Sequence, residues 1–215
     1  MLFIFDMGGV VTTTFPLDIL TSKLGLSKNE FLEICRLNGD IWNRLEKGQI
    51  EIRDFWKSFN DADKSVILKN TEGGRNLIDG KLNAPRLFHQ VHNDLFRLYF
   101  HPQLQTPTAE LVMALRKKHR VVCGTNTIQS HWENHMERGD YSFFDQTYAS
   151  NKIGEAKPDP HFFEVILEAE GYKAEEAFFT DDKIENCQAA ESLGIKAVHF
   201  ESPEKLWEEW RKYTE

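Results

Sequence analysis

Short, almost unbroken apolar runs recur along the chain, and amphipathic segments separate the later ones. Five runs read as buried strands, at residues 2–5, 120–124, 145–149, 177–180 and 196–200. Helical spacing of apolar residues appears over about 107–118, 160–170 and 184–193. Buried parallel strands have such continuous apolar runs, and their alternation with helices is typical of repeated βα units. The pattern predicts an α/β fold, a Rossmann-like parallel sheet flanked by helices.

Two proline pairs mark where predicted helices begin. Thr106 precedes Pro107, and Asp159 precedes Pro160. Each pair places a side chain that can cap a helix before a proline that suits its first turn. We therefore expect Thr106 and Asp159 to be N-caps.

A long insertion follows the first strand. Residues from about 16 to 101 read as helical throughout, and Ser27 with Glu30 forms a capping-box pattern. Asp40 can cap the next helix. One-sided apolar stripes comprise Ile52, Phe55, Trp56 and Phe59, and then Leu87, Val91, Leu95 and Leu98. The sequence predicts a core domain of residues 1–15 and 102–215 and a helical cap domain of residues 16–101 over the strand ends.

Composition and charge narrow the partners. The 215 residues carry a net charge of −8, which repels nucleic acid and anionic membranes and favours a small molecule. No apolar stretch approaches membrane-spanning length, and Asp6 comes too early for a secretory signal. Cys35, Cys123 and Cys187 are widely spaced among apolar residues, so we expect reduced core thiols in a cytoplasmic protein.

Asp6 directly follows the first apolar run and precedes Met7-Gly8-Gly9. An acid at the carboxyl end of a parallel strand lies where open α/β sheets bind their ligands. Two glycines after it allow a sharp turn and a close approach of main-chain N–H groups to an anion. The segment predicts a carboxylate nucleophile beside a phosphate, and the alternative is an aspartate that caps a turn.

Two later segments offer phosphate-binding groups. Thr125 and Asn126 follow the second strand, where a hydroxyl and main-chain N–H groups could hold a phosphate oxygen; a plain strand-exit turn is the alternative. Lys157 precedes Pro158, which keeps it out of a helix and presents its side chain from an extended loop. A lysine held in this way can neutralise a phosphate and a carboxylate, although most loop lysines are simply solvated.

Asp181 and Asp182 directly follow the apolar run at 177–180. Two adjacent carboxylates repel each other, and a hard cation relieves that repulsion. Oxygen ligands beside a phosphate favour Mg²⁺. A solvated pair, or a cap for the next helix, is the alternative.

Other candidate residues point to structure rather than chemistry. His131 and His135 lie one helical turn apart without the adjacent Glu of zinc proteases, so we expect a solvated helix face. Trp42, Trp56 and Phe59 have helical spacing and are expected in the core of the cap.

The order D-M-G-G-V, T-N, K-P and D-D, each at a strand end or a helix start, resembles the haloacid dehalogenase-like (HAD) hydrolase superfamily over the whole chain. The helical insertion is similar to a C1 cap. Within the superfamily, the FD-x-G-x-V opening, Glu46-Lys47-Gly48, and FF-x-DD followed by Asn186 resemble the bacterial α-D-glucose-1-phosphate phosphatase group.

The resemblance implies a role for each motif residue. Asp6 would attack phosphorus and form an aspartyl-phosphate. Substrate contacts would come from Met7, Gly8, Thr125, Asn126 and Lys157, with Thr125 and Lys157 also counted as catalytic. Mg²⁺ would be bound by Asp6, the main-chain carbonyl of Gly8, and Asp182, with Asp181 as a direct or indirect partner.

Gly8 departs from the pattern of most HAD phosphatases, which have an acid at this position to protonate the leaving oxygen. One hypothesis is that the substrate is an anomeric sugar phosphate, whose leaving hydroxyl is more acidic than an ordinary alcohol. The leading reading is a Mg²⁺-dependent phosphatase of a small phosphorylated metabolite, with neither nucleic acid nor membrane as partner and a homodimer left open. A 2-haloacid dehalogenase-type hydrolase and a phosphate-binding regulatory protein without turnover are the alternatives.

Overall fold

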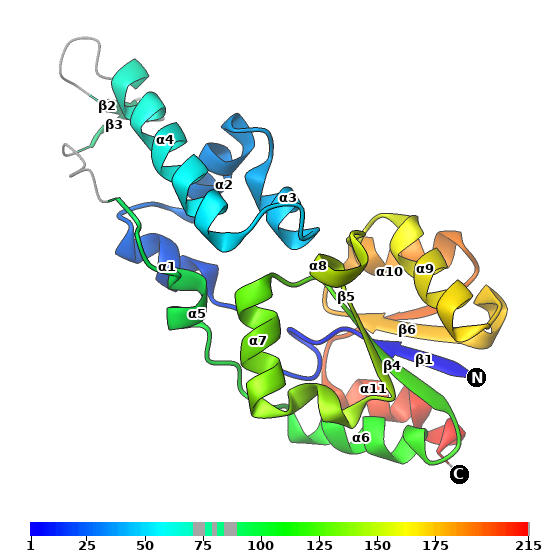
Figure 1. Cartoon of the computed structure of the whole chain (residues 1–215). Helices are drawn as coiled ribbons and strands as arrows, with labels where there is room; N and C mark the ends of the chain where they lie inside the picture. Colours follow the sequence, from blue (N-terminus) through cyan, green and yellow to red (C-terminus); the bar gives the residue numbers. More distant parts are fainter. Residues whose placement is uncertain (71–75, 79–80, 84–89, 215) are drawn as a thin grey trace. The chain divides into compact units, whose positions relative to one another are not determined.

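The computed structural model describes residues 1–70, 76–78, 81–83 and 90–214, with side chains for 1–62 and 90–214 (Figure 1). The chain forms two compact units. The first, an α/β unit, contains Met1–Phe15, Glu46–Gly48 and Phe100–Glu215. The second, a mainly helical unit, contains Pro16–Leu45 and Gln49–Tyr99.

A five-stranded parallel sheet forms the centre of the α/β unit. Its strands stand in the order β5-β4-β1-β6-β7, and every neighbouring pair is parallel. Their bounds are β1 Leu2–Phe5, β4 Arg120–Thr125, β5 Gln146–Ala149, β6 Ala177–Asp181 and β7 Lys196–His199. The predicted α/β fold and its five strands are therefore confirmed, although the edge strands β5 and β7 are only partly buried rather than buried as predicted.

Helices cover both faces of the sheet (Figure 1). Their bounds are α6 Thr106–Arg116, α7 Gln129–Arg138, α8 Ser150–Ile153, α9 Pro160–Glu170, α10 Ile184–Ser192 and α11 Pro203–Trp210, with short 3-10 turns at Asp140–Phe143, Ala174–Glu176 and Arg211–Tyr213. Successive side chains of a strand point to opposite faces. Phe3 and Phe5 of β1 accordingly pack in one core with residues of α6 and α11. Leu2 and Ile4 pack in the other core, with residues of α9 and α10.

Of the two predicted N-caps, Asp159 is confirmed and Thr106 is not. The Asp159 side chain accepts from the main-chain N–H of His161 at 3.0 Å and caps α9. Thr106 is instead the first residue of α6, and Gln105 occupies its cap position. A main-chain bond from Gln105 N–H to the carbonyl of Val11 fixes that entry.

The helical unit contains α1 Leu17–Lys23, α2 Lys28–Leu37, α3 Ile41–Glu46, α4 Ile52–Asn70 and α5 Leu95–Tyr99, with strands β2 Asn76–Ile78 and β3 Lys81–Asn83. The predicted capping box of Ser27 and Glu30 is present. The prediction of helix throughout 16–101 is wrong at the antiparallel pair β2–β3.

The predicted stripe from Leu87 to Leu98 is also not one helix. Val91 precedes α5, and its main chain bonds to the side chain of Asn60 rather than to a helical neighbour. Leu87 lies outside the described residues.

Aromatic side chains form the core of the helical unit, as predicted for Trp56 and Phe59. Phe55 is fully buried, and Trp56 and Phe59 are nearly so. The rings of Trp56 and Phe96 stack at 4.7 Å between centroids. Trp42 packs edge-on against Phe31 at 6.0 Å. These aromatic side chains therefore pack the core of the helical unit.

The prediction of a solvated face for His131 and His135 is wrong, because both side chains are buried. The ring of His131 stacks on Phe100 at 4.0 Å. Nδ1 of His135 lies 2.8 Å from the buried carboxylate of Asp140. Phe100 begins the long C-terminal segment of the α/β unit and packs against both histidines of α7. The spacing of residues along the chain did not indicate this contact.

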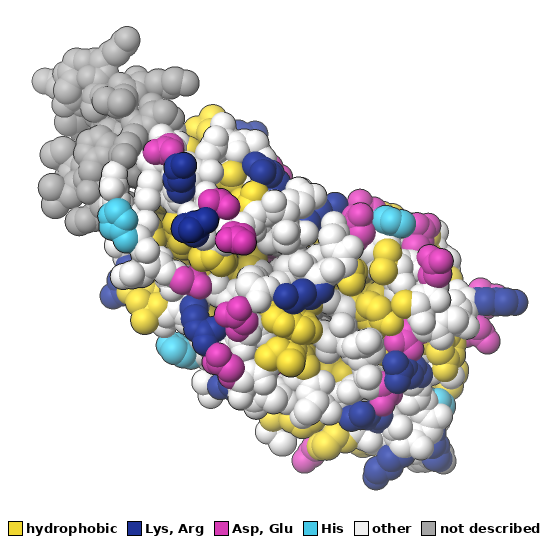
Figure 2. Space-filling model, viewed as in Figure 1, with side chains coloured by type: hydrophobic (Ala, Val, Ile, Leu, Met, Phe, Trp, Pro, Cys, Tyr) yellow, Lys and Arg dark blue, Asp and Glu magenta, His cyan; other side chains and the backbone are white. Residues whose placement is uncertain are grey.

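Basic and acidic side chains are interspersed over the visible face of the α/β unit (Figure 2). Among the described residues, no helix has both the length and the apolar content needed to cross a membrane.

Candidate active site

The carboxyl ends of β1 and β6 bring acidic side chains to one edge of the sheet. Phe5 pairs with Thr180, so the residues that follow, Asp6 and Asp181, come out side by side. Asp6, Asp181 and Asp182 each offer one carboxylate oxygen, and these oxygens lie within 4.8 Å of one another. Strand pairing thus brings Asp6 to the adjacent carboxylates of Asp181 and Asp182, which are far from it in sequence.

Lys157 places an ammonium between two of these carboxylates. Its Nζ lies 2.9 Å from Oδ1 of Asp6 and 2.6 Å from Oδ2 of Asp181. It also donates to the main-chain carbonyl of Gly124 at 2.8 Å. With a side chain only 1% exposed, Lys157 is fixed by three oxygens rather than solvated.

Asn126 holds the main chain of Lys157 in place. Its Nδ2 donates to the Lys157 carbonyl, and its Oδ1 accepts from the Lys157 N–H, each at 2.8 Å. The side chain of Asn126 therefore has a positioning role, whereas the sequence suggested only its main chain. Thr125 is buried at the end of β4, directly beside it.

Asp181 and Asp182 have different surroundings. Oδ2 of Asp181 accepts from Lys157 and from Nδ2 of Asn186 at 2.9 Å, and Oδ1 accepts from the main-chain N–H of Lys183 at 2.8 Å. Oδ1 of Asp182 is buried and has no hydrogen-bond partner in the described part of the chain. Because a buried carboxylate oxygen needs a partner, Asp182 fits a direct cation ligand and Asp181 fits an anchor for Lys157.

The two glycines in the turn after Asp6 differ in whether a side chain would fit there. Gly9 has φ +89°, and a Cβ there would stand 2.5 Å from Oδ2 of Asp182. Gly8 has room, since a Cβ would meet only atoms of Thr14 at 3.8–4.0 Å. The fold therefore requires glycine at position 9, while glycine at position 8 is not a steric necessity.

Met7 enters the site only through its main chain. Its side chain is 1% exposed and belongs to the hydrophobic core. Its carbonyl accepts from the main-chain N–H groups of Val11 and Thr12 at 2.9 and 2.8 Å, which closes the turn.

Burial and neighbouring charges set the electrostatics of the site. Burial raises the pKa of Asp6 to about 6, with Asp181 adding to this and Lys157 opposing it. Burial disfavours the ammonium of Lys157, but Asp6 and Asp181 outweigh it and raise the pKa of Lys157. For Asp181, Lys157 and three hydrogen bonds outweigh burial and lower the pKa. Burial, followed by repulsion from Asp181, raises the pKa of Asp182.

These carboxylates fit a hard divalent cation. Such an ion would satisfy the unpartnered oxygen of Asp182 and relieve the repulsion that raises its pKa. Lys157 does not neutralise Asp182, because its ammonium group is already paired with Asp6 and Asp181.

Two residues that sequence reasoning missed support the site. Nε2 of Gln105 donates to the carbonyl of Gly9 at 3.2 Å. Nε2 of His199, at the end of β7, lies 3.0 Å from the carbonyl of Asp182. Both act on main-chain groups from distant segments, so no local motif signals them.

A parallel sheet with an acidic cluster and one buried lysine at its carboxyl edge defines an α/β protein built for chemistry on anionic substrates. The family model described as haloacid dehalogenase-like hydrolase matches residues 1–194, and the chain belongs to this family.

Two relatives match most of the chain. Sesquiterpene phosphatase astK of Aspergillus oryzae is 25% identical over 92% of this chain and 88% of its own length. Glyceraldehyde 3-phosphate phosphatase of Methanocaldococcus jannaschii is 28% identical over 81% and 79%. A HAD family enzyme from Bacteroides thetaiotaomicron, crystallised with magnesium and inorganic phosphate, has a TM-score of 0.66 at 24% identity over 93% of both chains. The structural likeness shows the fold, and the finer resemblance to the α-D-glucose-1-phosphate phosphatase group stays a prediction.

Proposed function

We propose that this protein is a Mg²⁺-dependent phosphatase that hydrolyses a phosphomonoester of a small metabolite. The observation that carries the proposal is the placement of Lys157 between Asp6 and Asp181, beside Asp182 with its unpartnered oxygen. Two phosphatase relatives and a family neighbour crystallised with magnesium and phosphate support it.

Asp6 is the nucleophile in this proposal. Its pKa of about 6 leaves it ionised at neutral pH. One carboxylate oxygen attacks phosphorus, the bond from phosphorus to the leaving oxygen breaks, and the phosphoryl group is carried on Asp6. Water then attacks the aspartyl-phosphate, which releases inorganic phosphate and restores the carboxylate.

Lys157 and the ion share the charge neutralisation that phosphoryl transfer needs. Lys157 offers a fixed positive charge 2.9 Å from the nucleophile. Asp6, Asp182 and the main-chain carbonyl of Gly8 would hold Mg²⁺, which supplies further neutralisation of the phosphoryl oxygens. Asp181 keeps Lys157 in position, and Thr125 and the main chain of Asn126 would contact the phosphoryl group.

A sugar phosphate is the proposed substrate, with phosphate on the anomeric carbon. With glycine at position 8, this position supplies no carboxyl group to protonate the leaving oxygen. An anomeric leaving hydroxyl is more acidic than an ordinary alcohol and needs less protonation. Hydrolysis of sugar 1-phosphates faster than the matching 6-phosphates is expected, and equal rates would count against this substrate class.

A metabolite phosphatase screen with Mg²⁺ or with excess chelator tests the activity, with Asp6→Asn as the blank. We expect phosphate release that needs both Mg²⁺ and Asp6. Halide release from 2-haloacids that survives chelation would instead support dehalogenation. Trifluoroberyllate binding to Asp6 without turnover on any substrate would support a regulatory phosphate-binding protein.

A further inference from the structure

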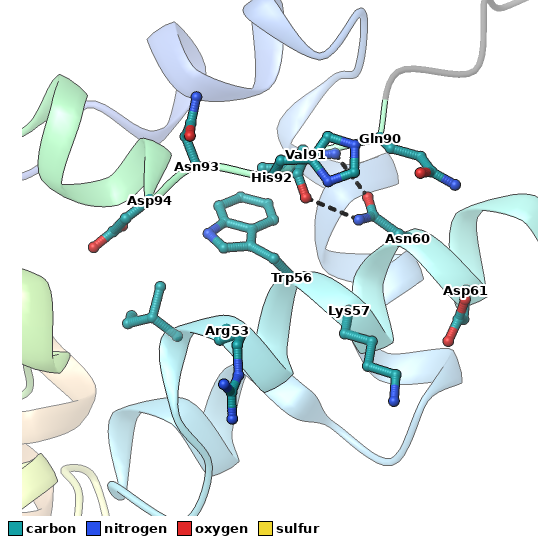
Figure 3. A pocket seen from close by; sticks show the side chains of 11 residues that line it. Arg53, Trp56, Lys57, Asn60, Asp61, Gln90, Val91, His92, Asn93 and Asp94 are labelled. Carbon is teal, nitrogen blue, oxygen red and sulfur yellow. Dashed lines mark hydrogen bonds between the residues drawn. The ribbon is translucent and has the colours of Figure 1, made fainter.

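A pocket of about 540 Å³ opens within the helical unit, separate in sequence from every residue of the candidate active site (Figure 3). One wall is α4, from Ile52 to Asp61, and the other is the segment from Gln90 to Asp94. Its size falls in the range of small-molecule sites, roughly 300–1,000 Å³. The pocket is therefore large enough to hold a ligand of metabolite size.

The indole of Trp56 is the distinctive group of this pocket. Trp56 is 3% exposed, and its Nε1–H donor has no hydrogen-bond partner in the described part of the chain. In Figure 3 the indole nitrogen points to the side on which Asp94 lies, which is another residue of the pocket lining. A buried donor without an acceptor is unfavourable, by about 1–3 kcal/mol in general, so an acceptor on a ligand would be stabilised there.

The walls are held in place before any ligand arrives. Asn60 joins them, since its Nδ2 donates to the carbonyl of Val91 at 2.9 Å and its Oδ1 accepts from the Val91 N–H at 3.0 Å (Figure 3). The indole ring of Trp56 stacks on Phe96 at 4.7 Å, which fixes the direction of its N–H. A preformed pocket binds without a large ordering cost.

The polar lining indicates the kind of ligand. Arg53 and Lys57 bring two positive charges and Asp61 and Asp94 two negative charges, so the lining favours neither an anion nor a cation. It combines donors, including the Trp56 N–H, with carboxylate acceptors. Hydroxyl groups donate and accept equally well, whereas a phosphate group mainly accepts and an ammonium group only donates.

Apolar groups complete the match. Ile52, Trp56 and Val91 line the same pocket between the polar side chains. A pyranose has hydroxyls around its rim and C–H groups on its faces, so it suits a lining of this mixed character. We propose that the pocket between α4 and residues 90–94 binds a neutral sugar of monosaccharide size, whose hydroxyl accepts from the Trp56 indole. This second site is independent of the proposed phosphatase activity.

The full chain, labelled with ¹⁵N, gives a direct test through its five tryptophan indole N–H signals. The signal missing from Trp56→Phe identifies Trp56. We expect titration with methyl α-D-glucopyranoside to shift this signal in a saturable way, with a dissociation constant on the order of 1 mM. The signal of Trp207, which is 38% exposed on α11, should stay unmoved.

Two further variants replace exposed residues of the pocket, so that the hydrophobic core is not disturbed. Arg53→Gln and Asp61→Asn should each weaken the titration by about fivefold or more, as expected for loss of a charged hydrogen-bond partner. Arg36→Gln removes a charge from exposed α2 of the same unit and should leave it unchanged. Absence of a Trp56 shift at about 100-fold higher sugar overturns the proposal. Equal shifts of all indole signals, or a shift with inorganic phosphate and none with the sugar, also overturn it.

Discussion

Nζ of Lys157 lies 2.6 Å from Oδ2 of Asp181, and both side chains are withdrawn from solvent almost completely. The pair connects the loop before α9 to the end of β6. The pair positions the ammonium group of Lys157, which also lies 2.9 Å from Oδ1 of Asp6. Breaking a buried ion pair leaves an uncompensated charge, so this contact couples stability to the site.

Replacement of Lys157 by methionine should affect both properties. Asp6 and Asp181 would lose their shared cation, and the free energy of unfolding should fall by about 3–5 kcal/mol. Phosphatase activity should fall to the level of the Asp6→Asn blank. Urea unfolding and phosphate release measure the two effects. Exposed Lys205→Met on α11 is the control, and equal stability of both variants would contradict the role of the pair.

Asn substitution should separate the roles of Asp181 and Asp182. Asp182→Asn removes a carboxylate whose oxygen is unpartnered, so stability should hold or rise while the Mg²⁺ concentration for half-maximal activity rises at least tenfold. Asp181→Asn removes the partner of Lys157 and should lower stability by about 3 kcal/mol. Thermal unfolding without metal and Mg²⁺ titrations of activity measure the contrast. The opposite pattern would exchange the two roles.

Alanine at position 9 should disturb the site through a single methyl group. Its Cβ would stand 2.5 Å from Oδ2 of Asp182, so that carboxylate must move. A displacement near 1 Å in a catalytic group can lower kcat/KM about 100-fold. The matched control is Gly139→Ala, because Gly139 also has positive φ, +72°, but has nothing within 4 Å of an added Cβ.

Gly139→Ala should lower stability by about 1 kcal/mol through backbone strain and leave kcat/KM unchanged. Similar kinetics for the two variants would show that contact with Asp182 is not what requires glycine at position 9.

His135 should make the protein less stable as the pH drops below about 6.5, whereas Asp6, whose pKa is raised to about 6, acts in the opposite direction. Burial lowers the pKa of His135 from its ordinary 6.5, against the opposing effect of Asp140. The unfolded chain then binds a proton more readily than the folded chain, so acidification favours unfolding from the unfolded pKa downward. In urea unfolding between pH 7.5 and 5.5, the free energy of unfolding of His135→Gln should decrease less, or increase more, on acidification than that of the unsubstituted protein. An equal change in both proteins would contradict this contribution.

Sequence determined the elements wherever a local pattern carried the information. Continuous apolar runs predicted β1, β4 and β6 most directly, since a strand covered on both faces needs apolar residues at nearly every position, whereas the edge strands β5 and β7 are only partly buried. Asp159-Pro160 and Ser27 with Glu30 located helix starts, because capping acts over three residues. The family was accessible for the same reason, as its motifs are short strings at strand ends.

Tertiary structure alone decided what each motif residue touches. Parallel pairing of β1 with β6 brought Asp6 beside Asp181, and the loop after α8 brought Lys157 to both. Asp181 and Asp182 are adjacent in sequence, but successive side chains at a strand end point in different directions. Asp181 therefore pairs with Lys157, whereas Oδ1 of Asp182 has no hydrogen-bond partner in the described part of the chain. The burial of His135 and the bonds of Asn60 to Val91 likewise depend on distant segments, and such contacts leave no periodic trace in the chain.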